Sequence, residues 1–194
     1  ATTSAYGQPT FLGNHDMGRV GYFLYSATFR DEDLTLARSK LANEVLFFSR
    51  GAPVMYYGDE KGLTGEGGDS KSRQDLFPTK VEDWQSEYRI GSKPIGNKSA
   101  FDITNPLELQ LKSISELISK NPALRKGTQQ LRATEGSAVA MSRYLDGLEY
   151  AVIFNSAEAP ESITFPVSTT SNWSQIYGPA TKANVDGKKI SLKI

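Results

Sequence analysis

Residues 9–16 read Pro-Thr-Phe-Leu-Gly-Asn-His-Asp, a short apolar segment that ends in three polar side chains. This order is typical of a buried strand that delivers functional groups at its C-terminal end. Residues 53–60, Pro-Val-Met-Tyr-Tyr-Gly-Asp-Glu, repeat the layout. Between them, apolar side chains recur at helical spacing over residues 31–50, and Gly51 and Pro53 end that helix. The sequence therefore predicts a strand, a helix and a second strand.

The two predicted strands would pair in parallel, because a helix joins them. In a parallel sheet or barrel the C-terminal ends of the strands share one edge, where such folds place their chemistry. His15, the only histidine, and Asp16 would therefore lie near Asp59 and Glu60. A histidine beside a carboxylate offers a hydrogen-bond donor and an anion in one place. An Asn-His-Asp turn whose side chains satisfy one another is the other interpretation.

The composition excludes several classes of function. The 194 residues include 22 Lys and Arg and 22 Asp and Glu, so no net charge favours nucleic acid or an anionic membrane, and we expect neither as a partner. Cysteine is absent, which excludes disulfides and thiolate chemistry. No apolar run approaches the roughly 20 residues of a membrane-spanning helix. A neutral substrate fits this balance better.

A long segment of low periodicity, residues 61–102, follows the second strand. Loops of this length are usually functional or mobile. A second helix should then begin with Asn105 as its N-cap, Pro106 at the first helical position and Glu108 as the reciprocal capping residue. The Asn-Pro pair at 121–122 ends it.

Beyond Arg125 the apolar pattern changes to period two, which predicts an antiparallel β-domain. Pro and Gly near residues 121–127 place the boundary, which gives domains 1–124 and 125–194. Because the last predicted strand runs to Ile194, we expect the β-domain to lack a closing strand. The expected strands, with a tight Asp146-Gly147 turn after the first, cover residues 139–145, 148–154, 163–165, 173–177 and 190–194.

Three motifs occur in a fixed order: Phe-Leu-Gly-Asn-His-Asp-Met-Gly-Arg at 11–19, Gly-Ala-Pro-Val-Met-Tyr-Tyr-Gly-Asp-Glu at 51–60 and Gly-Gly-Asp-Ser-Lys-Ser-Arg-Gln-Asp at 67–75. Together with the predicted helices, this set resembles the α-amylase superfamily, glycoside hydrolase family thirteen. The resemblance implies an α/β part formed by the last two strand/helix units of a TIM (β/α)8 barrel, with residues 9–14 and 53–57 as its seventh and eighth strands. An antiparallel β-sandwich would follow.

The resemblance also implies roles at the end of the first strand. Asp16 would be the carboxylate that stabilises an oxocarbenium-like transition state, and His15 would hydrogen-bond sugar hydroxyls at the cleavage point. Asn14 and Arg19 would also bind substrate. Pairing with an acidic neighbour is the equally open alternative for Arg19.

Asp69 and Arg73 match the family's aspartate and arginine that bind glucose units further toward the non-reducing end. Their four-residue spacing would put both on one side of a helical turn, although Ser70 replaces the family's frequent proline. A solvated surface pair is the alternative interpretation. Asp59 and Glu60 are expected to shape the strand end rather than to catalyse or to bind a metal.

The implied reaction is hydrolysis of α-1,4-glucosidic bonds, with retention, in starch-like glucans or maltooligosaccharides. Retention needs a nucleophile and an acid/base about 5 Å apart, and the family's residues for both precede the strand at 9–14. We therefore expect this chain alone to be inactive. We expect the exposed barrel flanks to be covered by self-association, by rearranged packing against the β-domain or by a separate chain that supplies the rest. We assign no cofactor and no metal ligand, because the family's usual calcium ligands lie upstream; calcium would belong to the full-length protein. A polymeric substrate predicts a secreted protein.

A carbohydrate-binding or interaction module is the alternative function, with glycan bound by the β-domain. It would require an exposed aromatic platform. In the long loop, Trp84 and Tyr88 would either stack on sugar or only anchor the loop. The candidates for a platform on the β-domain are Tyr144, Tyr150, Trp173 and Tyr177.

Overall fold

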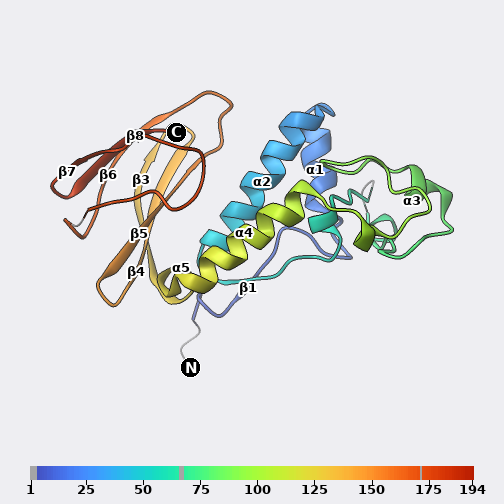
Figure 1. Ribbon diagram of the computed structural model, residues 1–194, viewed down its shortest axis with the longest axis horizontal. Helices are drawn as coiled ribbons and strands as arrows, with labels where there is room; N and C mark the ends of the chain where they lie inside the picture. The colour runs from blue at the N-terminus through green and yellow to red at the C-terminus, as the bar shows by residue number, and fades with distance from the viewer. Residues whose placement is uncertain (1–3, 66–67, 171) are drawn as a thin grey trace. The chain divides into compact units, whose positions relative to one another are not determined.

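The computed structural model describes residues 4–65, 68–170 and 172–194, and the chain divides into two compact units (Figure 1). The first comprises Ala1–Phe47 and Gly51–Leu117, and the second comprises Phe48–Arg50 and Ile118–Ile194. None of the helices in the described ranges is long and apolar enough to span a membrane.

The first unit contains one parallel strand pair. β1 (Pro9–Thr10) pairs with β2 (Ala52–Pro53) in parallel, with Pro9 opposite Ala52 and Thr10 opposite Pro53. The parallel order is as predicted, but the predicted strands 9–14 and 53–57 are too long, since each observed strand has two residues. The reason on the first strand is local: beyond Thr10 the backbone folds back, and Asn14 bridges Gly18 in antiparallel fashion.

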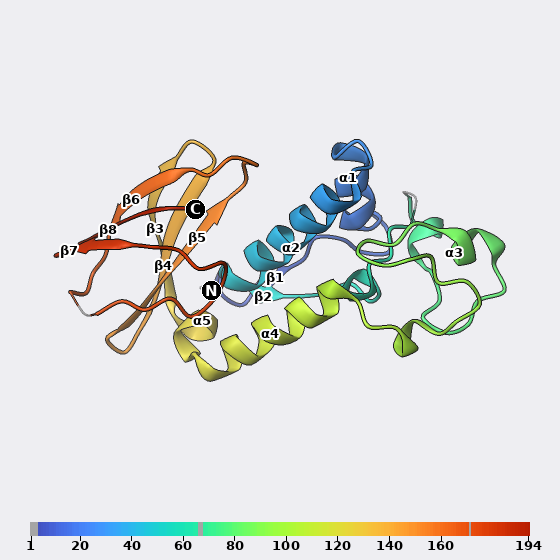
Figure 2. The ribbon, with the colours of Figure 1, turned by 45° about the horizontal axis from the view of Figure 1, so that its top comes forward.

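The first unit also has the helices α1 (Val20–Ala27), α2 (Glu32–Phe48), the short α3 (Glu82–Ser86) and α4 (Pro106–Lys120), with single 3-10 turns η1 (Asp59–Lys61), η2 (Ser70–Ser72) and η3 (Ala100–Asp102). Of these, α2 and α4 run on either side of the β1–β2 pair (Figure 2). α1 was not predicted, because Arg19 at its N-cap position provides no side-chain cap and Gly21 weakens its pattern.

α2 buries an unexpected side. Asp31 starts it by accepting a hydrogen bond from the Leu34 amide at 2.8 Å. The side chains buried along it include the polar Thr35, Ser39 and Asn43, spaced four apart, and the apolar Leu46 and Phe48 at its end, whereas the apolar Val45 is exposed. The apolar repeat therefore predicts the helix correctly without marking the side that this unit buries.

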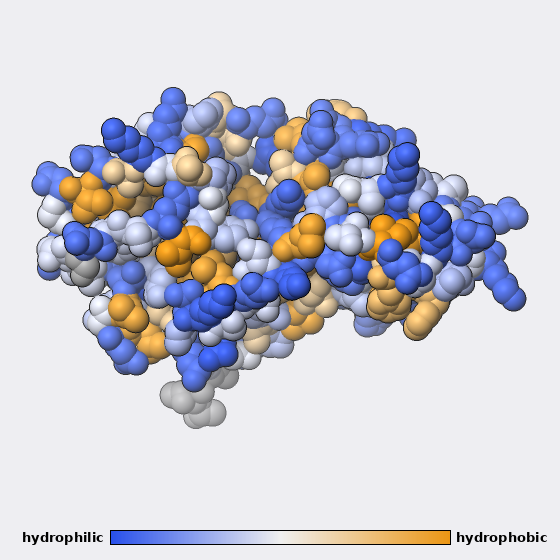
Figure 3. All heavy atoms as spheres, in the orientation of Figure 1, coloured by the Kyte–Doolittle hydropathy of each residue, from blue (hydrophilic) through white to orange (hydrophobic). Residues whose placement is uncertain are grey.

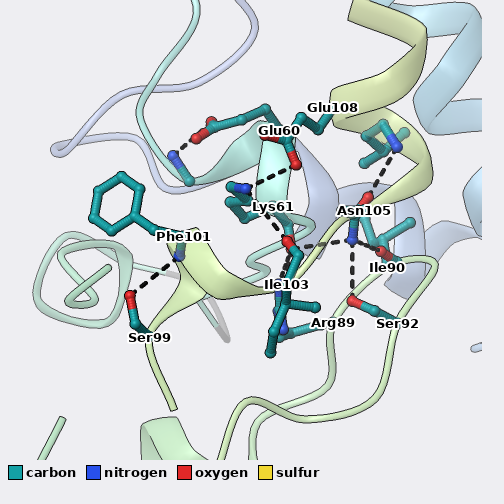
Figure 4. Close-up of polar contacts among 12 residues, drawn as sticks. Glu60, Lys61, Arg89, Ile90, Ser92, Ser99, Phe101, Ile103, Asn105 and Glu108 are labelled. Atoms are coloured by element: carbon teal, nitrogen blue, oxygen red, sulfur yellow. Dashed lines mark hydrogen bonds and ion pairs between the residues drawn. The ribbon is translucent and has the colours of Figure 1, made fainter. Parts of the chain in front are cut away.

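Asn105 caps α4 as predicted, because its Oδ1 accepts a hydrogen bond from the Leu107 amide at 2.9 Å. The predicted reciprocal role of Glu108 is wrong. Its Oε2 lies 2.7 Å from Nζ of the buried Lys61 (Figure 4). The need to neutralise a buried ammonium outweighs a capping hydrogen bond.

The long loop is held by backbone acceptors at its start and by aromatic stacking. The Lys61 carbonyl accepts hydrogen bonds from the Arg89 guanidinium, at 2.7 and 3.1 Å, and from Asn105 Nδ2 at 3.1 Å (Figure 4). Tyr88 stacks on Tyr25 of α1, with ring centroids 3.9 Å apart. Residues 61–102 are therefore anchored to α1 and to the start of α4.

The second unit contains α5 (Pro122–Lys126) and two antiparallel three-stranded sheets. One sheet has the order β3 (Thr128–Glu135), β4 (Ala138–Leu145), β5 (Leu148–Asn155). The other has the order β6 (Ser162–Pro166), β8 (Lys189–Lys193), β7 (Asn184–Asp186). Positive φ angles at Asp146 (49°) and Gly147 (83°) form the predicted tight turn.

The strand predicted at 173–177 is wrong, because residues 172–177 have no strand pairing. The Gln175 side chain organises this stretch as a loop: its Nε2 donates to the carbonyls of Tyr177 and Pro179, and its Oε1 accepts from the Thr181 amide. β3 and β7 were not predicted, since β3 is largely polar and β7 has three residues.

The two sheets share an apolar core. It comprises Ala138, Ala140, Ile163, Phe165, Val167 and Ile190, all at most 4% exposed, and Trp173 packs against its margin. Elsewhere hydrophobic side chains reach the surface of each unit among hydrophilic ones (Figure 3).

Candidate active site

Four of the predicted site residues form one exposed polar cluster. His15 Nε2 lies 3.2 Å from Asp16 Oδ1. Arg73 Nη2 lies 3.6 Å from Asp16 Oδ1 and 3.6 Å from Asp69 Oδ2. Each side chain is at least half exposed, with Asp16 at 68%. Arg73 therefore joins two loops that lie more than fifty positions apart in the sequence.

The first loop presents His15 and Asp16 through a turn built by Asn14. Asn14 Oδ1 accepts hydrogen bonds from the amides of Asp16 (2.9 Å) and Met17 (2.8 Å), and its backbone pairs with Gly18. This is the local side-chain-to-backbone bonding expected of asparagine in a turn. The Asn14 oxygen thus positions its neighbours.

The second loop presents Asp69 and Arg73 from one helical turn. Ser72 is fully buried: its Oγ donates to the Gly68 carbonyl at 2.6 Å, and its carbonyl accepts from the Tyr56 hydroxyl at 2.9 Å. Because η2 follows Asp69, the two side chains meet at i, i+4 as their spacing predicts. The buried serine fixes the loop while its charged neighbours face solvent.

Arg19 lies in a separate, buried network. Its side chain is 0% exposed, and its Nη1 lies 2.7 Å from Asp59 Oδ1 and donates to the Tyr57 carbonyl at 2.6 Å. Its Nε donates to Gln74 Oε1 at 2.8 Å, and the Tyr56 ring lies 4.5 Å from the guanidinium carbon. Pairing with an acidic neighbour, one of the two predicted alternatives, is confirmed, and burial keeps Arg19 from solvent in this structure.

Asp59 and Glu60 do not join the His15–Asp16 cluster. Burial raises the pKa of the Asp59 carboxyl to about 6, and the charge and hydrogen bond of Arg19 offset part of that rise. Glu60 Oε2 accepts a hydrogen bond from the Gly58 amide at 2.8 Å. Both acids shape the segment after β2, as predicted. No group of three or more potential ligand side chains able to hold a metal ion is found in residues 4–65, 68–170 and 172–194.

The aromatic candidates divide by exposure. Tyr88 anchors its loop on Tyr25, and burial raises the pKa of its hydroxyl to about 12. In the second unit, Tyr150 donates to Asn121 Oδ1 at 2.7 Å, and Tyr177 packs edge-on against Phe48. Of the four candidates there, Tyr144 alone is classed as exposed, at 41%. A flat platform of several rings is therefore not formed by these four residues.

Sequence reasoning missed the residues that hold the two loops. Gln74 accepts from Arg19 and donates from Nε2 to Glu87 at 2.6 Å, and it is buried. Tyr56 links the two loops, because its ring lies against the Arg19 guanidinium and its hydroxyl donates to the Ser72 carbonyl. Gln74 and Ser72 stand within the motif at 67–75, but nothing in their residue type distinguishes a buried anchor from a solvated side chain.

The cluster has the chemistry to bind a polyhydroxylated ligand and to stabilise a developing positive charge. Asp16 supplies an accessible carboxylate, and His15 and Arg73 supply hydrogen-bond donors beside it. A single carboxylate of this kind favours a cationic transition state but does not provide both a nucleophile and an acid/base.

Comparison with known proteins gives a consistent result. The family model described as "Alpha amylase, catalytic domain" matches residues 1–135. An alpha-amylase from Streptomyces lividans is 39% identical over 193 residues, covering 95% of this chain and 21% of that protein. A cyclomaltodextrin glucanotransferase from a Bacillus species (strain 1-1) is 42% identical over 87 residues, covering 44% of this chain and 10% of that protein.

The fold is also similar to solved structures. The crystal structure of an alpha-amylase from H. orenii superposes with a TM-score of 0.67 at 20% identity, covering 97% of this chain and 38% of that chain. The chain thus spans about a fifth of the length of the Streptomyces relative and less than half of that solved structure.

Proposed function

The chain belongs to the alpha-amylase family, and from this we propose that it carries one wall of a site that cleaves α-1,4-glucosidic bonds in starch-like glucans or maltooligosaccharides with retention. The observation that carries the proposal is the exposed cluster in which Arg73 bridges Asp16 and Asp69 beside His15. In this assignment, residues 1–124 are the end of a (β/α)8 barrel and residues 125–194 a β-sandwich.

Each member of the cluster has a role that its surroundings support. Asp16 is the anion that stabilises positive charge at the reacting sugar carbon, and its 68% exposure leaves it accessible to a ring above it. His15 donates to sugar hydroxyls. Asp69 and Arg73 hold a neighbouring glucose unit, which a carboxylate and a guanidinium do through fixed hydrogen bonds.

The nucleophile and the acid/base would come from polypeptide outside these residues. Retaining cleavage needs two carboxyl groups about 5 Å apart, and the two carboxyl groups of the exposed cluster, Asp16 and Asp69, both contact Arg73. The 194-residue chain by itself is therefore proposed to be inactive. The exposed apolar side chains Phe11, Phe23, Val45 and Val54 support the further proposal that it self-associates when produced alone.

The test is hydrolysis of a chromogenic maltooligosaccharide by the complete enzyme that contains these residues. Asp16→Asn should lower turnover about 10²- to 10³-fold, the loss typical when transition-state charge is left unstabilised. His15→Ala should lower turnover and raise KM together. Asp186→Asn, an exposed acid in β7, is the matched control and should leave both unchanged. Undiminished turnover in Asp16→Asn would refute the assignment, and efficient hydrolysis by the isolated chain would refute its proposed inactivity.

A further inference from the structure

The inner surface of the β3-β4-β5 sheet changes character along its length. On β4, alternate residues Ala138, Ala140, Ser142 and Tyr144 share one face. Ala138 and Ala140 lie in the core formed with β6 and β8. Ser142 and Tyr144 instead line a cavity of about 140 Å³, at which the second sheet provides only Ser168, two residues past the end of β6. The sheet therefore presents polar side chains where its apolar core stops.

The polar surface is built on a buried ion pair. Arg132 Nη2 lies 2.6 Å from Glu149 Oε1, and the two side chains are 9% and 0% exposed. Arg132 Nε donates to Ser142 Oγ at 2.7 Å, and Ser142 Oγ donates to Glu149 at 2.6 Å. The Ser168 amide donates to the second Glu149 oxygen at 2.7 Å. A network this complete holds its members in one geometry.

The pair leaves the cavity without net charge. Burial alone would raise the pKa of Glu149, but the hydrogen bonds from Ser142 and the Ser168 amide and the charge of Arg132 hold it below its ordinary value. Glu149 is therefore ionised at neutral pH and offsets the arginine. An anionic ligand gains little electrostatic attraction at such a site. A neutral ligand with hydroxyl groups binds there without burying an unpaired charge.

Several groups in the cavity remain available to such a ligand. Arg132 lines the cavity with a side chain that is 9% exposed, and its hydrogen bonds to Ser142, Glu149 and Ser168 use Nε and Nη2 rather than Nη1. The exposed side chains of Gln130 and Thr128 add an amide and a hydroxyl from β3. Tyr144, at 41% exposure, adds an aromatic wall. Fixed donors and acceptors beside one aromatic face are the groups that recognise a sugar ring.

We propose that this cavity binds one pyranose unit of a neutral oligosaccharide, as a second site separate from the His15–Asp16 cluster. Its volume of about 140 Å³ limits it to a ligand of about one ring. Tyr144 stacks on the ring, and Arg132 Nη1, Gln130 and Thr128 bond its hydroxyls. The inference does not depend on Asp16 being catalytic.

An NMR titration of the 194-residue chain with maltose tests the proposal. The amide signals of Gln130 and Ser168 should shift together. Tyr144→Ala should raise the Kd about tenfold and Gln130→Ala about fivefold, which correspond to about 1.4 and 1 kcal/mol. Tyr144→Phe, which keeps the ring, should retain most of the affinity. Leu148→Ala, an exposed position that pairs with Leu145 and so lies on the opposite face of the same hairpin, is the matched control and should bind as the wild type does.

Three results would overturn the proposal. One is the absence of maltose-dependent shifts at Gln130 and Ser168 in a folded chain. Another is unchanged affinity in both Tyr144→Ala and Gln130→Ala. The third is a response of the same signals to sodium sulfate in place of maltose, which would make the cavity an anion site. A His15→Ala arm separates the two proposals: loss of maltose binding there, with Tyr144→Ala unaffected, would refute the cavity site and leave the proposed function standing.

Discussion

Two arginine–aspartate arrangements in the first unit use the same residue types in opposite surroundings. Arg73 contacts Asp16 and Asp69 at 3.6 Å, with all three side chains at least half exposed. Arg19 contacts Asp59 at 2.7 Å, with both side chains at least nine-tenths buried. Exposed pairs are weak and replaceable by water or ligand, whereas a buried pair cannot lose one partner cheaply. Solvent accessibility, and not residue type, therefore distinguishes the side chains that can contact a ligand, such as Arg73, from those that position the loops, such as Arg19.

The buried arrangement supports the exposed one through shared elements. Arg19 lies four residues after His15, at the N-cap position of α1. Because Asp59 and Gln74 hold its guanidinium, they also fix the end of the loop that carries His15 and Asp16. Gln74 likewise follows Arg73 directly. One buried network therefore fixes both cluster-bearing loops at their bases.

The largest expected difference is in stability. Arg19→Met should lower the free energy of unfolding by about 3–5 kcal/mol, because it leaves the Asp59 carboxylate buried and unpaired. Arg73→Met, the matched exposed change, should cost less than about 1 kcal/mol. Urea unfolding of both variants at neutral pH measures the difference. Equal losses would show that the two arrangements do not differ as their burial indicates.

The contribution of the buried Asp59 carboxyl to stability should depend on pH. Burial raises the pKa of Asp59 from 3.8 to about 6, so the folded state binds more protons than the unfolded state between these values. The stability that protonation contributes is fully present below about pH 4 and is lost as the pH rises through 6. The shift of about 2 units corresponds to a loss of at most about 3 kcal/mol.

Urea unfolding of wild type and Asp59→Asn at pH 4.5 and pH 7 isolates this contribution, since other titrating groups cancel in the difference. The stability of the wild type relative to Asp59→Asn should be greater at pH 4.5 than at pH 7. A difference that does not change with pH would show that Asp59 titrates alike in both states.

A glycine pair tests how closely the buried network is packed. Gly58 has a φ of 87°, and a Cβ there would lie 2.6 Å from Leu63 Cδ1 and 3.2 Å from Arg19 Nη2. Gly68 has a similar φ of 78°, but nothing lies within 4 Å of its Cβ position. Gly58→Ala should therefore lower stability by about 2 kcal/mol and Gly68→Ala by about 1 kcal/mol, from backbone strain alone. Thermal unfolding measures the stability of both variants. An equal loss of stability would mean that Leu63 and Arg19 move aside for the added Cβ at no measurable cost.

The sequence predicts the parts of this molecule that depend on local chemistry. The helical repeat and the Asn105 cap define α2 and α4, and the Asp146-Gly147 turn defines the β4–β5 hairpin. The i, i+4 contact of Asp69 and Arg73 follows from spacing alone.

The remaining features depend on distant contacts. Arg19 is buried because Gln74 and Asp59, 55 and 40 positions away, receive its hydrogen bonds. The segment at 173–177 has strand composition, but the hydrogen bonds of one glutamine side chain hold it as a loop. No local pattern encodes either outcome, because each needs partners that only the folded chain brings together.

The exposed arrangement leaves open whether Asp69 and Arg73 bind sugar or only form a solvated pair, and kinetics decide between these interpretations. In the complete enzyme, Arg73→Met should raise KM for a maltooligosaccharide about tenfold, or about 1.4 kcal/mol, while lowering stability by less than about 1 kcal/mol, because the guanidinium that joins Asp16 to Asp69 is lost from an exposed position. Arg73→Lys keeps the charge but loses the planar donor fork, so it should restore only part of the affinity. An unchanged KM in both variants would identify the pair as solvated surface charges. It would also restrict sugar binding on this wall to His15 and Asp16.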